Sequence, residues 1–251
     1  AITALATFAT ERDRAVERAR RPFRVDQLSG PVPFDRAWEM RDDDAGLFGL
    51  VGIGGDDLTA IGPDLAAAGS FVVGGPAKSG RSAVLLSMTR SVLREGGEVV
   101  LVTPRQSPLR GLAAEPGVLA VHEGADLTED DLAPLFDGQP GRRVLVIDDA
   151  ELVKDAPAKS WLQGFVKRAA DNGQAIVAAG LTAEFGVGFT GWQVDMKRNR
   201  SGALLSPQAI TEGDLLGMRL PRSSIVERVQ VGSALVHLGD GALVSVQVPS
   251  P

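Results

Sequence analysis

The segment from Gly75 to Ser82 reads Gly-Pro-Ala-Lys-Ser-Gly-Arg-Ser and constrains the fold of this chain more than any other feature. It fits the phosphate-binding loop pattern G-x-x-x-x-G-K-[ST] at every position except one, where Arg81 replaces the lysine. An apolar run precedes the segment at 70–73, and a helix-like segment follows it at 82–94. A strand, a glycine-rich loop and a helix in this order are the context that such a loop requires. The segment therefore predicts a nucleotide-binding α/β fold.

The backbone of this loop is the candidate phosphate site. Successive N–H groups and a helix N-terminus form a cradle for anions, and glycine lets the backbone approach the phosphates closely. Arginine is a longer, planar cation than lysine, so Arg81 either holds phosphate or fills the space of the γ-phosphate. We predict that ATP and Mg²⁺ bind here, with the Ser82 hydroxyl facing the metal. The predicted cofactor-binding residues are Gly75, Pro76, Ala77, Lys78, Ser79, Gly80, Arg81 and Ser82.

A second motif lies about seventy residues downstream, where four apolar residues at 144–147 are followed by Asp148 and Asp149. Such a run predicts a buried parallel strand, and the carboxyl end of a strand is where α/β sheets bind ligands. Asp148 is the predicted Mg²⁺-side acid. Asp149 is the predicted catalytic residue, although it is one methylene shorter than the glutamate that usually orients the attacking water; Glu151 is an alternative. The competing interpretation is a strand followed by acids that cap a helix.

The composition of the 251 residues excludes several classes of function. The chain has no cysteine, so disulfides and thiol chemistry are excluded. His122 and His237 are the two histidines, and their distance in sequence argues against a histidine metal site. No apolar run approaches the roughly 20 residues of a membrane span. The net charge of −6 argues against DNA as a partner, because wrapping nucleic acid needs a clustered basic surface.

The sequence predicts two regions. Residues 1–44 are interpreted as an N-terminal helix with a basic second half, followed by an irregular linker arm. Residues 45–251 are interpreted as one α/β domain, because strands that alternate with helices imply a mostly parallel sheet. A hairpin is expected around 54–57, and a helix with a capping box is expected to begin near Thr128. Short strands are expected in the last forty residues, at 226–231, 234–238 and 242–248.

Together these motifs resemble the FtsK/SpoIIIE-type ATPase domain, over roughly residues 45–249. The resemblance rests on the hairpin, the Pro-Asp-Leu stretch at 63–65, the phosphate-binding loop and the acidic strand. The stretches Ser-Gly-Ala-Leu-Leu-Ser-Pro at 201–207 and Gly-Asp-Leu-Leu-Gly at 213–217 are narrower, and are similar to the degenerate C-terminal modules of EccC/EssC proteins of type VII secretion. The resemblance implies a RecA-like, additional-strand P-loop NTPase fold: a mostly parallel sheet flanked by helices, with extra antiparallel strands at its edges.

Three departures from the family pattern bear on activity. Arg81 replaces the loop lysine, Asp149 replaces the catalytic glutamate, and Ala-Gly-Leu-Thr at 179–182 replaces a stretch that usually carries a polar sensor. Phosphoryl transfer depends on positioning and electrostatics, so each departure raises the barrier. We therefore expect a degenerate module with weak or no ATP hydrolysis, serving in assembly, regulation or recognition of exported substrate. The alternative is an active motor domain for protein export or DNA translocation.

The resemblance also implies partners. These are sister ATPase modules of the same polypeptide or ring, and the signal peptide of an exported helical dimer. Arg198 and Arg200 are candidates for an arginine that acts on the phosphates of a neighbouring module, with Arg105 and Arg110 as alternatives. The competing interpretation of each is an ordinary solvated or salt-bridged arginine. A groove that binds a helix is expected for the peptide. The competing interpretation of its candidate wall residues is that they belong to the hydrophobic core. Those wall residues are Trp161, Leu162, Phe165, Phe185, Phe189 and Trp192.

The location of the chain is also an expectation from the resemblance. The chain begins without Met, which is interpreted as the start of a fragment. We expect a cytoplasmic domain of a membrane-anchored protein, attached to the membrane only through a missing N-terminal part.

Overall fold

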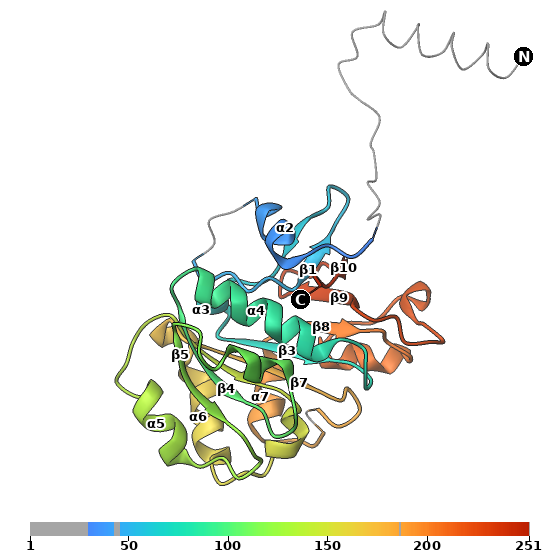
Figure 1. Cartoon of the computed structure of the whole chain (residues 1–251). Coiled ribbons are helices and arrows are strands. Elements are labelled where there is room, and N and C mark those ends of the chain that lie inside the picture. The colour runs from blue at the N-terminus through green and yellow to red at the C-terminus, as the bar shows by residue number, and fades with distance from the viewer. Residues whose placement is uncertain (1–29, 43–45, 186, 251) are drawn as a thin grey trace, which may run out of the picture.

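A ten-stranded sheet runs through the described part of the chain, residues 30–42, 46–185 and 187–250 of the computed structural model (Figure 1). The strand order is β2-β1-β10-β9-β8-β3-β7-β6-β4-β5. The strands are β1 (Gly52–Gly54), β2 (Thr59–Ile61), β3 (Ser70–Gly74), β4 (Glu98–Val102), β5 (Val118–His122), β6 (Arg143–Ile147), β7 (Ala175–Gly180), β8 (Ser201–Leu205), β9 (Ser233–Leu238) and β10 (Val244–Gln247).

The sheet has a parallel part and an antiparallel part. Strands β8, β3, β7, β6, β4 and β5 are parallel neighbours. Strands β9, β10, β1 and β2 continue from β8 as antiparallel neighbours. Strand β7 lies between β3, which leads into the phosphate-binding loop, and β6, which ends in the acids, so it is the additional strand. The predicted fold class is confirmed, with all the antiparallel strands at one edge.

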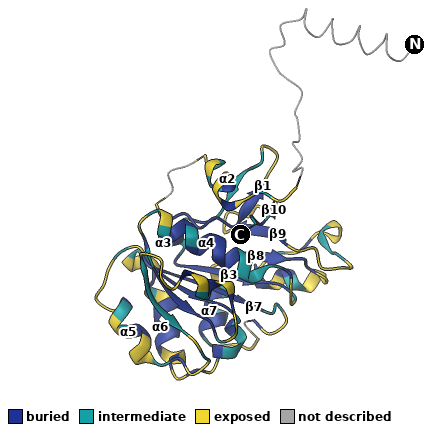
Figure 2. Ribbon diagram, viewed as in Figure 1, coloured by how far each residue is buried: buried dark blue, intermediate teal, exposed yellow. Residues whose placement is uncertain are grey.

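Helices cover both faces of the parallel strands (Figure 1). The side chains of β3 show how: Phe71 and Val73 pack in one core with α4, whereas Val72 packs in the other with α6 and α7. Except in the partly buried edge strand β5, both faces of these strands are buried, so their sequences are continuous apolar runs rather than alternating ones (Figure 2). The helices are α2 (Phe34–Glu39), α3 (Leu65–Ala68), α4 (Arg81–Arg94), α5 (Glu129–Phe136), α6 (Lys159–Arg168) and α7 (Trp192–Arg198), with 3-10 turns η1 (Pro108–Leu112), η2 (Ala150–Val153), η3 (Ala170–Asn172), η4 (Ile210–Leu215) and η5 (Arg222–Ser224).

The N-terminal part of the described chain is more ordered than the sequence indicated. The predicted linker arm contains α2, whose Phe34 and Ala37 pack in a small core with Phe48 and Leu50. The predicted helix at 1–21 lies outside the described residues. None of the described helices is long and apolar enough to cross a membrane.

Three local elements predicted from the sequence have different outcomes in the structure. The hairpin is confirmed as β1 and β2, joined through Gly55 in a left-handed conformation. The strand predicted at 226–231 is wrong, because its valines at 229 and 231 face solvent rather than a core. The capping box is present: the Thr128 hydroxyl and backbone N–H both donate to Asp131. These hydrogen bonds hold the pKa of Asp131 below its usual value, and the bond from the hydroxyl has the larger effect.

Candidate functional site

The predicted phosphate-binding loop joins β3 to α4 at the carboxyl edge of the parallel strands. Gly80 has a φ of 106° and accepts backbone hydrogen bonds from Ala83 and Val84, which start the helix. A side chain at Gly75 would place its Cβ 2.7 Å from the hydroxyl of Ser79 and 3.1 Å from the Leu205 carbonyl oxygen, so a larger residue at this position would crowd the loop. The strand, loop and helix therefore have the arrangement that the motif predicted.

The Arg81 side chain folds back onto its own loop. Its guanidinium donates to the Gly75 carbonyl at 2.8 Å and to Asp149 Oδ1 at 3.0 Å. The two side chains of this ion pair are only 11% and 16% exposed, so water screens the pair weakly. The guanidinium thus bridges the start of the phosphate-binding loop and the acidic end of β6, and Asp149 balances its charge.

Asp148 receives hydrogen bonds from three sides. Its Oδ2 accepts from the Ser82 hydroxyl at 2.7 Å and from the Ser107 hydroxyl at 2.8 Å, and its Oδ1 accepts from the Asp149 N–H at 3.1 Å. The structure thus brings together Ser82 and Asp148, the two predicted metal-side residues. Sequence reasoning missed Ser107; the signal was a hydroxyl just after β4, which is the parallel neighbour of β6.

Replacing Ser107 by alanine is expected to lower the free energy of unfolding by about 1.5 kcal/mol, because a buried carboxylate loses a hydrogen-bond donor. Urea unfolding followed by circular dichroism measures the change. Ser223→Ala is the control, since Ser223 is exposed on η5 and should change stability by less than about 0.5 kcal/mol. Equal unfolding midpoints for the two variants would show that the hydroxyl of Ser107 contributes nothing to holding Asp148.

Asp149 is placed differently from a free catalytic base. Its φ of 47° is left-handed, a strained conformation for a residue other than glycine. Its carboxylate is engaged by Arg81. The alternative acid, Glu151, accepts from the backbone N–H of Leu181 at 3.3 Å. Both carboxylates therefore already accept hydrogen bonds from the protein, so neither is free to orient an attacking water with all its acceptor sites.

The stretch at 179–182, where the usual polar sensor is expected to be lost, places one hydroxyl beside the loop. The Thr182 hydroxyl is buried, makes no hydrogen bond within the described residues, and lies 3.2 Å from where Gly74 would carry a Cβ. Gly74 pairs with Gly180 of β7, which places Thr182 just beyond the adjacent strand end. The sensor position is therefore altered but not apolar.

The residues of the loop fit a bound nucleotide. The Ser79 hydroxyl is fully buried without a partner in the described chain, so a donor is present in the loop beyond the backbone N–H groups. Mg²⁺ commonly takes one or two protein ligands and completes its shell with phosphate and water. The Ser82–Asp148 pair matches that pattern, because it offers a hydroxyl and a carboxylate side by side.

The predicted intermodule arginines lie at the opposite edge of the sheet. They precede β8, and the neighbouring Asn199 donates to the hydroxyl of Ser70 at the start of β3. Arg198 is 66% exposed and pairs with Asp195 at 2.5 Å. Arg200 is exposed with a φ of 51°. The structure therefore separates both from the phosphate-binding loop of their own chain.

The alternative arginines lie after β4 instead. Arg105 is exposed, whereas Arg110 bonds to Thr103 and Glu123 of its own chain.

The predicted groove walls do not form one surface. Phe165 is fully buried, with its ring 4.8 Å from Phe136 and 4.9 Å from Trp161, between ring centroids. Trp192 is buried and Phe189 is 95% exposed. The remaining candidates, Leu162 and Phe185, are also buried. Apart from Phe189, these side chains belong to the core on one face of the sheet, which the apolar stripe of α6 helps to form.

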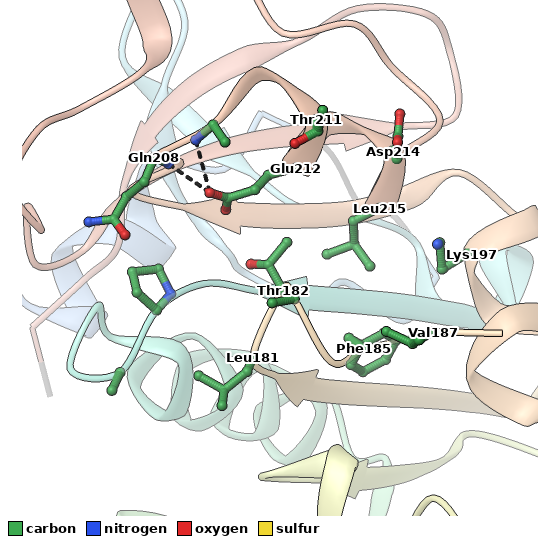
Figure 3. A pocket seen from close by; sticks show the side chains of 14 residues that line it. Leu181, Thr182, Phe185, Val187, Lys197, Gln208, Thr211, Glu212, Asp214 and Leu215 are labelled. Atoms are coloured by element: carbon green, nitrogen blue, oxygen red, sulfur yellow. Dashed lines mark hydrogen bonds between the residues drawn. The ribbon is translucent and has the colours of Figure 1, made fainter.

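A cavity of about 580 Å³ lies instead beside the phosphate-binding loop (Figure 3). It is bounded by the loop itself, the segment after β7 and the 3-10 turn η4. Its apolar lining comes from Pro76, Ala77, Leu181, Phe185, Val187 and Leu215, and polar side chains include Thr182, Lys197, Gln208 and Glu212. Glu212 is held by the backbone N–H groups of Gln208 and Ala209 at 2.9 and 3.0 Å. Of the predicted groove residues, only Phe185 lines this cavity.

The parallel sheet, the inserted β7 and the loop with its acidic partner strand define the fold of a P-loop NTPase. No family model and no curated protein matches the sequence. Solved structures do match, and three of them are similar over nearly all of this chain. The cytoplasmic domain of EssC has a TM-score of 0.71 at 15% identity, covering 96% of this chain and 51% of its own.

Two further structures contain tandem modules. Thermomonospora curvata EccC (ATPases 2 and 3), in complex with a signal sequence peptide, has a TM-score of 0.70 at 18% identity, covering 98% of this chain and 48% of its own. EssC (ATPases 2 and 3) from Geobacillus thermodenitrificans has a TM-score of 0.67 at 16% identity, covering 100% of this chain and 51% of its own. The chain thus spans about half the length of these structures. It has the fold of the EssC and EccC ATPase domains.

Proposed function

We propose that this chain is one ATPase module of a type VII secretion motor that holds nucleotide but hydrolyses it weakly or not at all. The ion pair between Arg81 and Asp149 is the observation that carries the proposal. It engages the cation and the carboxylate that stand where an active module has its phosphate-binding lysine and its water-orienting glutamate. Phosphate release close to that of a protein-free control is the expected result.

The role of such a module is then assembly or recognition. The matched EccC structure carries a signal sequence peptide, which supports a peptide of an exported helical dimer as the partner here. The cavity beside the loop is the site we propose for an apolar side chain of that peptide, since apolar anchors in a groove dominate this mode of binding. Sister modules of the same polypeptide or ring are the other proposed partners. The proposed location is cytoplasmic.

Replacing Val187 by glutamate is expected to weaken binding of a helical signal peptide at least tenfold, because it places a charge at the apolar lining of the cavity. Val187 is 54% exposed, so the fold should tolerate the change. Fluorescence anisotropy with a labelled peptide measures the affinity. Val231→Glu is the matched control, since Val231 is 71% exposed and does not line the cavity. Equal losses in both variants would place the peptide elsewhere.

A second candidate function is an active ATP-hydrolysing motor domain for protein export or DNA translocation. The hydrogen bond between Ser82 and Asp148 favours it, because that pair is the part of the site that would position Mg²⁺. Steady phosphate release that Ser82→Ala abolishes would support this candidate. Duplex binding at low salt would support DNA as the partner, against the expectation from the net charge.

A further inference from the structure

The phosphate-binding loop carries two cations, and the structure gives them different surroundings. Arg81 is largely buried and bonded to Gly75 and Asp149. Lys78 is exposed, and its ammonium makes no hydrogen bond or ion pair within the described residues. The unbalanced positive charge of the loop therefore belongs to Lys78 rather than to the residue at the usual lysine position.

The backbone of Lys78 adds a second observation. Its φ of 63° is left-handed, a conformation that costs free energy for any residue with a Cβ and that glycine adopts freely. Glycine at this position would relieve the strain without altering the course of the loop. Strained residues that persist where a relaxed one would fit cluster at functional sites. The strain therefore points to a use for the lysine side chain.

We propose that Lys78 supplies the free cation of the phosphate cradle, and that the cradle prefers a ligand with a diphosphate group, such as a nucleoside diphosphate. This inference rests on the proposed function, in which the module holds nucleotide. In an ordinary loop the backbone N–H groups hold the α- and β-phosphates, and the lysine at the position of Arg81 reaches the β- and γ-phosphates. Asp149 balances the charge of Arg81 here, so a third phosphate gains little.

The geometry of the loop agrees with a diphosphate. The flexible four-carbon stem of a lysine lets the ammonium of Lys78 fold over phosphates bound by the neighbouring N–H groups. The buried Ser79 hydroxyl, which lacks a partner in the described residues, adds a donor in the same loop. A γ-phosphate would instead meet a cation that is already paired, because Asp149 balances the charge of Arg81. ADP should therefore bind at least as tightly as ATP.

Calorimetric titration of the unaltered chain and of Lys78→Gly with ADP, ATP, AMP and inorganic pyrophosphate tests the inference. The unaltered chain should bind ADP at least as tightly as ATP and at least tenfold more tightly than AMP. Lys78→Gly should weaken ADP binding at least tenfold, yet raise the melting temperature by about 2–4 °C as the strain is relieved. Because binding and stability move in opposite directions, misfolding is excluded as the cause. Lys159→Met, which removes an exposed lysine at the start of α6, is the control.

The outcomes separate this inference from the proposed function. Equal ADP affinity in Lys78→Gly and the unaltered chain would overturn the role of Lys78 but leave a nucleotide-holding module. Tenfold tighter binding of ATP than of ADP would overturn the preference for a diphosphate. A chain that binds no nucleotide would overturn both proposals. Pyrophosphate binding as tight as ADP would support recognition of the diphosphate alone, whereas weaker pyrophosphate binding would support an added contact with the nucleoside.

Discussion

Changing Arg81 to lysine and Asp149 to glutamate together is expected to raise ATP hydrolysis about 100-fold over that of the unaltered chain. The size follows from the 10²- to 10⁴-fold that a positioned proton-transfer group usually contributes. The ion pair of Arg81 and Asp149 now engages both groups. Lysine is a compact charge that can leave the loop carbonyl for the phosphates, and glutamate extends one methylene further toward the water.

Phosphate release at saturating ATP and Mg²⁺ measures this change. The double variant carrying Ser82→Ala as well is the control, because it removes the hydroxyl that would face the metal and should return release to background. Each single variant should stay near background. Arg81→Lys alone still lacks the longer carboxylate, and Asp149→Glu alone still lacks the lysine. An unaltered chain that already hydrolyses ATP as fast as the double variant would refute the proposed degeneracy.

Replacing Phe165 by alanine is expected to lower the free energy of unfolding by about 3–5 kcal/mol. The ring is fully buried and packs against Phe136 and Trp161, so its removal leaves a cavity between α6 and the sheet. Phe189→Ala should change stability by less than about 0.5 kcal/mol, because the ring is 95% exposed. The sequence made both residues candidate walls of one groove. The two stability changes would show that Phe165 belongs to the core and Phe189 does not.

Urea unfolding at equilibrium measures both variants. The midpoint should fall sharply for Phe165→Ala and stay unchanged for Phe189→Ala. Binding of the labelled peptide to folded Phe165→Ala, compared with Val187→Glu, then shows whether the core aromatic residues touch the peptide. A stable Phe165→Ala variant that loses peptide binding would restore the groove interpretation of α6.

Much of the fold could be predicted because its signals are local. The glycine-rich loop, the apolar run ending in Asp148 and the alternation of strands and helices are each contained in a few neighbouring residues. Continuous apolar runs indicated strands buried on both faces, and the structure confirms two cores separated by the sheet. The hairpin at 54–57 likewise depends on glycine adopting a left-handed conformation.

The parts that escaped prediction depend on contacts between distant residues. The ion pair of Arg81 joins positions 68 residues apart, and the bond from Ser107 to Asp148 spans 41. Neither contact leaves a local pattern. The aromatic residues of α6 show a related limit, because an apolar stripe has the same spacing whether it faces a core or a groove. Phe189, which is exposed, and Phe165, which is buried, were therefore not separated by the sequence.

This phosphate-binding loop differs from an ordinary one in one respect. The loop has its usual course, but the Arg81 guanidinium and the Asp149 carboxylate form an ion pair with each other. An active site needs both of these groups free. A nucleotide can then act as a structural ligand, because the backbone N–H groups remain to hold phosphates while the groups for chemistry are engaged. Such a module would contribute to its assembly through its shape rather than through turnover.

The most direct test is a calorimetric titration of the purified chain with ATP and Mg²⁺, with phosphate release followed in the same samples. We expect saturable binding with phosphate release no faster than in a protein-free control. Steady release from the bound complex, abolished by Ser82→Ala, would contradict it and show that the ion pair of Arg81 and Asp149 opens during an active cycle.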